Sequence, residues 1–170
     1  MKIAFDTVNV YYLPQFLPIC DELAKRGHQI KLVCYSNKND AQKFEQVLSA
    51  LTYEYCWVDD EKAAKELYLK DAPDWIFFGN SFSYLDEIHN VSKTAQLGHG
   101  VGPKPSYYHK SCTPMTVRFI EGKERLVKIK ELYPNDTFVQ VGFSKLDPLF
   151  NQTEPGLDYD KLGLDKDKPT

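Results

Sequence analysis

The chain has 170 residues and carries 21 Lys and Arg against 24 Asp and Glu, which gives a formal net charge of −3. This length suits one compact domain, and a content of 42% apolar and 14% aromatic residues excludes a disordered chain. The mild acidity argues against a nucleic-acid partner, because proteins that bind nucleic-acid backbones through charge are clearly basic.

Apolar runs alternate with amphipathic stretches from one end of the chain to the other. The runs predicted as strands are residues 3–5, 29–34, 53–58, 75–78, 94–97, 115–120 and 137–141. The stretches predicted as helices are residues 14–26, 40–51, 60–69, 83–89 and 122–132. This alternation predicts an α/β fold over residues 1–150, Rossmann-like and doubly wound, with a mainly parallel sheet. The unbroken apolar run at 75–78 predicts a strand that is buried on both faces.

Local signals mark several helix ends. Pro14 suits the first turn of the first helix, and Gly27 suits its carboxyl-terminal cap. Asp40 is the predicted cap of the second helix, and Asp59 or Asp60 that of the third. The predicted core stripe of the second helix consists of Phe44, Val47, Leu48 and Leu51.

The cysteines and the N-terminus indicate the compartment. The chain has no C-x-x-C pair, and its four cysteines are Cys20, Cys34, Cys56 and Cys112. We therefore expect free thiols in a reducing environment and no disulfide framework. The four histidines share no metal-ligand spacing, so no metal site is expected. Neither a signal peptide nor a run long enough to cross a membrane occurs, and a cytoplasmic protein is expected.

The stretch at 96–104 is the most informative for function. It follows a predicted strand, so it belongs at the carboxyl edge of the sheet, where open α/β folds bind ligands. Gly98, Gly100 and Gly102 let the backbone approach a ligand and turn N–H groups toward an anion. His99 could take a proton from an attacking hydroxyl, and Lys104 could hold phosphate oxygens. The stretch fits a glycine-rich turn with a surface histidine equally well.

A second stretch, at 141–150, also opens from a strand end. One interpretation puts Gly142 and Ser144 in the cleft, with Lys145 facing phosphate. The other makes the stretch a strand-to-helix turn that Asp147 anchors through backbone N–H groups.

No glycine fingerprint follows the first strand and no P-loop motif occurs, which argues against an NAD, FAD or P-loop nucleotide site. No cofactor is therefore expected.

Basic and aromatic side chains gather outside these two motifs. The predicted basic face consists of Arg118, Lys123, Arg125, Lys128 and Lys130. Such a face is either simply solvated or a patch for an anionic polymer or the inner leaflet of the plasma membrane. The tyrosine pairs at 11–12 and 107–108 fit either a substrate groove or packing of the core and its rim.

These residues resemble a known family. His99-Gly100 and the stretch from Val141 through Gly142, Ser144 and Lys145 to Leu149 are similar to the amino-terminal half of the CDP-glycerol glycerophosphotransferases, the teichoic-acid polymerases and primases. In this chain Gly98 replaces the aromatic residue that the family commonly has before its His-Gly pair. Ser144 replaces the proline of the family's second motif.

The resemblance implies one half of a two-domain GT-B enzyme. Residues 1–150 would be the acceptor-side domain, and residues 151–170 a linker toward a carboxyl-terminal donor-binding domain outside this sequence. His99 would be the general base for the acceptor hydroxyl, and glycerol phosphate would move from CDP-glycerol to a polyol-phosphate or glycan acceptor. The chain alone would then be inactive.

Two alternatives remain open at this stage. A GT-B enzyme that uses a nucleotide sugar, either a UDP-sugar transferase or an epimerase-like protein, would share the helix and sheet pattern. A stand-alone α/β module that binds a phosphorylated ligand through residues 98–104 would not be an enzyme at all.

Overall fold

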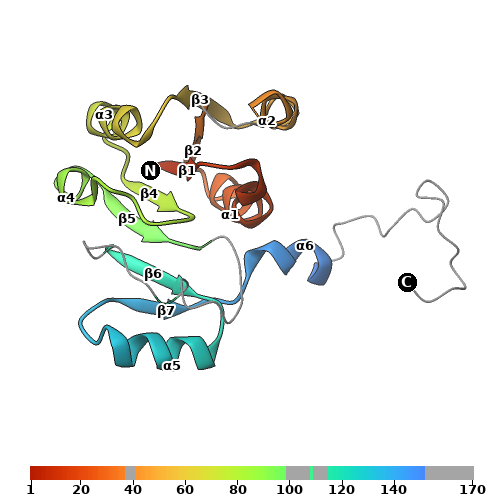
Figure 1. Cartoon of the computed structure of the whole chain (residues 1–170). Coiled ribbons are helices and arrows are strands. Elements are labelled where there is room, and N and C mark those ends of the chain that lie inside the picture. The colour runs from red at the N-terminus through yellow and green to blue at the C-terminus, as the bar shows by residue number, and fades with distance from the viewer. Residues whose placement is uncertain (37–40, 99–107, 109–114, 152–170) are drawn as a thin grey trace, which may run out of the picture.

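A computed structural model describes residues 1–36, 41–98, 108 and 115–151. Within these residues seven strands form one sheet in the order β3-β2-β1-β4-β5-β6-β7, and every neighbouring pair is parallel (Figure 1). The strands are β1 (Lys2–Thr7), β2 (Gln29–Tyr35), β3 (Glu54–Val58), β4 (Trp75–Phe78), β5 (Lys93–Gln96), β6 (Val117–Ile120) and β7 (Phe138–Gln140). The predicted Rossmann-like, doubly wound α/β fold is confirmed, because this strand order extends the Rossmann order. The predicted linker at 151–170 lies outside the described residues except for Asn151.

Helices connect the strands and cover both faces of the sheet. They are α1 (Leu13–Lys25), α2 (Ala41–Leu48), α3 (Glu61–Asp71), α4 (Leu85–Ile88), α5 (Lys123–Leu132) and α6 (Asp147–Phe150), with 3-10 turns η1 (Val10–Tyr12) and η3 (Ser144–Leu146). α1 and α2 pack on the face that carries Phe5 and Leu32, whereas α3 and α4 pack on the opposite face, which carries Ala4 and Val33. α5 packs on Ile120 and the first residue of β7.

The order in which successive strands are added across the sheet reverses at β1. β2 and β3 extend to one side of β1, and β4 to β7 extend to the other. Because β–α–β crossovers are right-handed, this reversal places the helices that follow β3, β4 and β6 on the face opposite to α1. The α1 side of β4 to β7 is therefore sparsely covered by the described helices. The prediction that the run at 75–78 is buried on both faces is wrong for this reason, since Trp75 and Phe77 are only half-buried.

The end of α1 follows its sequence signals. Pro14 lies in the first turn, and Gly27 has a φ of +81°, a left-handed conformation that glycine adopts without strain. The Gly27 N–H donates to the Ala24 carbonyl at 2.9 Å and the His28 N–H donates to the Leu23 carbonyl at 3.1 Å, which is a Schellman cap. The predicted carboxyl-terminal cap is confirmed.

The core stripe of α2 is narrower than its sequence predicts. Phe44 and Leu48 are buried, and the Phe44 ring packs edge-on against Trp57, with 5.4 Å between ring centroids. Val47 is exposed, so its prediction as a core residue is wrong. The α2 helix rests on the outer part of the sheet, where only a narrow stripe of its surface meets β2 and β3. The predicted cap Asp40 lies outside the described residues.

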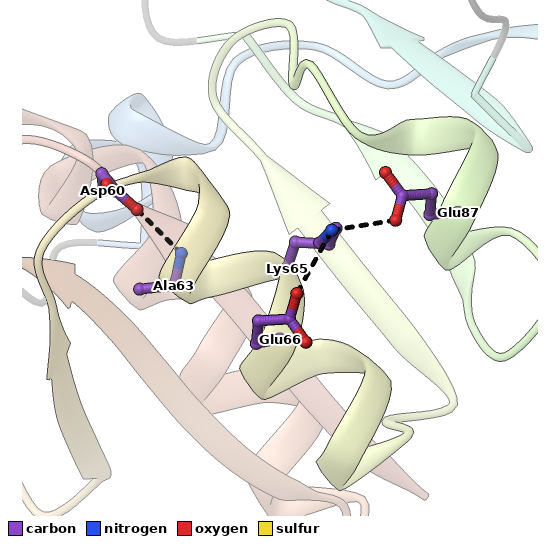
Figure 2. A network of polar contacts seen from close by, with 5 residues as sticks. All are labelled: Asp60, Ala63, Lys65, Glu66 and Glu87. Carbon is purple, nitrogen blue, oxygen red and sulfur yellow. Dashed lines mark hydrogen bonds and ion pairs between the residues drawn. The ribbon is translucent and has the colours of Figure 1, made fainter.

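The α3 helix begins at a side-chain cap. Asp60 has extended backbone geometry, and its side chain accepts a hydrogen bond from the Ala63 N–H at 2.8 Å (Figure 2). Asp60, rather than Asp59, is thus the residue that begins the helix. One turn on, Lys65 bridges Glu87 of α4 at 2.9 Å and Glu66 at 3.2 Å, which joins the two helices on this face (Figure 2).

Replacing Asp60 by Ala is expected to lower the free energy of unfolding by about 1 kcal/mol, because the amide of Ala63 loses its partner. Asp60→Asn retains an acceptor at the same place and is expected to cost clearly less. Urea unfolding of the two variants measures the difference. Equal losses in both would show that charge, and not the cap, stabilises the helix.

Candidate functional site

The loops that carry the two sequence motifs both begin at the carboxyl edge of the sheet. Gly98 follows β5 with a φ of +70°, and Gly142 follows β7 with a φ of +82°. A Cβ atom at either position would meet no atom within 4 Å, so the requirement for glycine there is conformational rather than steric. His99, Gly100, Gly102 and Lys104 lie outside the described residues, and their predicted roles stay predictions.

A hollow of about 310 Å³ lies where these loops meet α1. Its lining residues are Gln15, Ile19, Leu23, Phe77, Leu97, Phe119, Val141, Gly142, Ser144 and Asp147. Leu97 comes from the loop after β5, whereas Gly142 and Ser144 come from the loop after β7. The fold therefore brings the described ends of both motifs to one place.

The floor of the hollow is a pair of stacked phenylalanine rings. The Phe77 and Phe119 ring centroids are 6.4 Å apart, with an angle of 13° between the planes. Phe77 is in register with Ala95 of the intervening strand β5, a residue with a small side chain. Phe77 also stacks on Phe5, at 4.9 Å and 13°, so aromatic rings continue from the core into the hollow. The sparse cover of this face leaves Phe77 and Phe119 half-buried.

Ser144 fixes the loop after β7 to α1. Its Oγ donates to the backbone carbonyl of Gln15 at 2.6 Å, across 129 positions of sequence. Ser144 thus lines the hollow and anchors its wall, whereas the sequence assigned the anchoring role in this stretch to Asp147. Lys145 is exposed and is not among the lining residues.

Gln15 is the residue at this site that sequence reasoning missed. It is 3% exposed, and its side-chain Oε1 has no hydrogen-bond partner among the described residues. A glutamine near the start of an amphipathic helix resembles a surface residue in the sequence. Its burial depends on the packing of the η3 turn, more than one hundred positions away, so no local signal could have found it.

Tyr12, which follows β1, packs against the residues that follow β4, at the point where the order of the strands in the sheet reverses. Tyr12 is fully buried, and Asn80 donates a hydrogen bond from Nδ2 to its hydroxyl at 2.7 Å. Burial raises the pKa of Tyr12 above its ordinary value. Tyr11 is exposed and lies edge-on to the Tyr12 ring, at 4.9 Å between centroids. Of this tyrosine pair, one member therefore belongs to the core and the other to its rim.

A buried carboxyl group lies near the end of β1 on the opposite face. Asp6 is 2% exposed and accepts hydrogen bonds from Tyr35 at 2.9 Å and from Tyr68 at 2.8 Å, both on Oδ2. Burial raises the pKa of Asp6 to about 7, although the two tyrosine hydroxyls partly offset the rise and nearby Glu61 adds to it. This carboxyl group therefore changes charge near neutral pH, away from the residues that line the hollow.

The basic face predicted from the sequence is divided in the structure. Arg118 is 3% exposed, and its guanidinium group donates a hydrogen bond to Gln96. Its Nε atom lies 3.6 Å from Oδ2 of Asp136. The prediction that Arg118 belongs to a surface patch is therefore wrong. Burial also lowers the pKa of Arg118. Arg125 donates to Glu121 at 2.7 and 2.8 Å, which neutralises a second member of the face.

The remaining basic side chains belong to α5. Lys123, Lys128 and Lys130 are exposed, and the Lys128 ammonium lies 4.5 Å from the centre of the Tyr108 ring. Tyr108 is half-buried under α5, and Tyr107 lies outside the described residues. The exposed cations are thus fewer and more scattered than the sequence suggested.

The other sequence-level expectations concern thiols and metal ligands. Cys20, Cys34 and Cys56 are free thiols, as predicted, and Cys112 lies outside the described residues. His89 lies 2.8 Å, Nε2 to Oγ1, from Thr94, a structural contact. In the described part of the chain, no group of three His, Cys, Asp or Glu side chains could hold a metal ion. No helix there is long and apolar enough to span a membrane.

Comparisons with known proteins find similarity in structure only. No family model matches the chain, and no curated protein matches its sequence. MurG from Acinetobacter baumannii aligns with 84% of this chain and 67% of its own, at 8% identity and a TM-score of 0.40. A putative UDP-N-acetylglucosamine 2-epimerase from Listeria monocytogenes aligns with 100% of this chain and 49% of its own, at 7% identity and a TM-score of 0.42. The chain thus spans 67% and 49% of the lengths of these two proteins.

Proposed function

We propose that this chain is the amino-terminal, acceptor-side domain of a transferase that uses a nucleotide-activated donor. One observation carries the proposal. The loops after β5 and β7, which hold the two motifs similar to the glycerophosphotransferases, start at the carboxyl edge of a doubly wound sheet and border one hollow. Ligands of open α/β sheets bind at this edge, so the acceptor would bind there too.

The proposed reaction moves glycerol phosphate from CDP-glycerol to a hydroxyl group of a cell-wall or surface polymer. The acceptor oxygen attacks the β-phosphorus, a new P–O bond forms, and the bond from that phosphorus to the bridging oxygen breaks, so that CMP leaves. His99 accepts the proton of the attacking hydroxyl. The glycines at 98, 100, 102 and 142 direct backbone N–H groups, and Lys104 and Lys145 direct charge, toward the phosphate oxygens.

A donor-binding domain would complete the cleft. The segment from Leu146 to Phe150 exposes three large apolar side chains beside Asp147, which lines the hollow. Leu146 is 44%, Leu149 69% and Phe150 76% exposed. An apolar cluster next to a binding site is typical of a surface that another domain covers. We expect the donor-binding domain of the same protein to cover it, with the chain at 151–170 as the linker, and this chain alone to be inactive.

Replacing His99 by Ala in the protein that carries both domains is expected to reduce transfer by about 10²- to 10⁴-fold, because the acceptor hydroxyl loses its base. His28→Ala is the matched control, since His28 lies between α1 and β2, at the opposite edge of the sheet. The measurement is CMP release from CDP-glycerol, with thermal unfolding as the check on folding. Normal turnover by a folded His99→Ala protein would remove His99 from the mechanism.

The proposed donor, CDP-glycerol, has one specific alternative, a UDP-sugar. A UDP-sugar transferase or an epimerase-like enzyme would use the same sheet and the same edge, and its donor would carry uridine. The described residues that line the hollow include no Lys or Arg, which fits an acceptor that presents an uncharged group beside them. Parallel assays with CDP-glycerol and UDP-sugars separate the two donors.

A further inference from the structure

The unpartnered amide oxygen of Gln15, a residue that lines the hollow, points to a ligand with hydrogen-bond donors. Gln15 lines the hollow, is 3% exposed, and has a side-chain Oε1 that accepts no hydrogen bond from any described residue. Buried polar groups are costly unless they are paired, and a buried acceptor without a partner therefore needs an explanation. A bound hydroxyl group would supply the missing donor.

The other residues that line the hollow indicate the class of molecule that fits it. Six of the ten described residues that line the hollow are apolar, and the stacked rings of Phe77 and Phe119 are among them. Asp147 adds a carboxylate at the wall, and none of the described residues that line the hollow is cationic. Among these described residues a phosphate group would lie beside a carboxylate with no cation to balance it, so their charge disfavours an anion.

A neutral sugar ring combines the two properties that the lining requires. Its C–H face is apolar and packs on aromatic rings, whereas its hydroxyl groups donate hydrogen bonds around the rim. The volume of about 310 Å³ lies at the lower end of the range for small-molecule pockets, which suits a single ring better than a nucleotide.

We propose that this hollow binds one neutral, hydroxyl-bearing ring of pyranose size. The ring packs on Phe77 and Phe119, and its hydroxyl groups donate to Gln15 Oε1 and to the Asp147 carboxylate. That this ring belongs to the acceptor of the transfer rests on the proposed function, whereas the binding site itself does not.

The test titrates the 170-residue chain with methyl β-D-glucopyranoside and, separately, with glycerol 3-phosphate. Amide chemical shifts of Leu97, Gly142 and Ser144 report on the hollow. The neutral glucoside is expected to shift these resonances saturably, and glycerol 3-phosphate is expected to bind there more weakly. Absence of saturable shifts with the glucoside, or a preference of the hollow for glycerol 3-phosphate, would overturn the proposal.

Gln15→Met removes the amide, nearly keeps the side-chain volume and leaves the backbone carbonyl for Ser144. Affinity for the glucoside is expected to fall about tenfold or more, with an unchanged or raised midpoint of thermal unfolding. Gln46→Met, at an exposed position of α2, is the control and is expected to bind as wild type. Unchanged affinity in the folded Gln15→Met chain would contradict the role of the amide.

Two further measurements keep this inference separate from the proposed function. Asp147→Asn keeps an acceptor but removes the charge, and it is expected to narrow the preference for the glucoside over glycerol 3-phosphate. In the protein with both domains, Gln15→Met is expected to raise the KM for the acceptor and to leave kcat nearly unchanged. Transfer with an unchanged acceptor KM would refute this inference alone. Glucoside binding without transfer from any donor would refute the proposed function alone.

Discussion

Asp6→Asn is expected to abolish most of the pH dependence of stability between about pH 4 and about pH 8. The folded-state pKa of Asp6, about 7, lies above the ordinary value of 3.8, because burial disfavours the charged carboxylate. Between these two pKa values the folded protein holds a proton that the unfolded chain has lost. The contribution of Asp6 to the free energy of unfolding of the wild type therefore falls as the pH rises from about 4 to about 7, and it levels off above that range. With about 1.4 kcal/mol for each pH unit of difference, the fall approaches about 4 kcal/mol.

Asparagine at position 6 retains an oxygen that can accept from both Tyr35 and Tyr68, and it carries no charge at any of these pH values. Urea unfolding at a series of pH values measures the two profiles. Asp59→Asn is the matched control, because Asp59 is exposed and also accepts from a hydroxyl group, that of Ser36 at 2.7 Å. The control is expected to keep the wild-type slope. If Asp6→Asn kept it as well, the buried carboxyl group would not be its source.

Gly79→Ala is expected to lower the free energy of unfolding by about 1–3 kcal/mol, because the new methyl group has no space. A Cβ atom at this position would lie 2.6 Å from Cε2 and 2.7 Å from Cδ2 of Tyr12. The ring cannot move aside easily. It is fully buried, it packs edge-on against Phe16 at 5.8 Å, and Asn80 holds its hydroxyl group. Urea unfolding measures the loss.

A double-mutant cycle with Tyr12→Leu isolates this clash. Tyr12→Leu alone is expected to destabilise the protein by leaving a cavity, and in its presence the alanine methyl group gains space. The double variant is therefore expected to be more stable than the sum of the two single losses predicts. Strictly additive losses would show that the cost of Gly79→Ala arises from the backbone and not from contact with the ring.

The sequence predicted the fold well because its strand and helix signals are local. Each of the seven apolar runs is a strand, and Gly27 and Asp60 mark helix ends where their conformational preferences place them. Errors arose where burial depends on neighbours far along the chain. Val47 points away from the sheet, and Phe77 is half-buried because the reversal at β1 leaves its face open. Neither fact is visible in the spacing of apolar residues.

The candidate site was predicted only in part, for the same reason. Gly98 and Gly142 stood out because glycines at strand ends let the backbone approach a ligand, and both adopt left-handed conformations in the structure. Gln15 and Asp6 did not stand out, because their burial depends on η3 in one case and on Tyr35 and Tyr68 in the other. Buried polar residues are set by tertiary packing, and a single sequence does not distinguish them from surface residues.

We propose that this domain serves a transferase with a nucleotide-activated donor. The most direct test is release of nucleotide by the protein that carries both domains, supplied with CDP-glycerol or UDP-sugars and a polyol-phosphate or glycan acceptor. We expect acceptor-dependent release of CMP from CDP-glycerol. Acceptor-dependent release of UDP from a UDP-sugar instead would show that the protein is a nucleotide-sugar enzyme. Release of no nucleotide from any donor would contradict the claim and leave a domain that only binds its ligand.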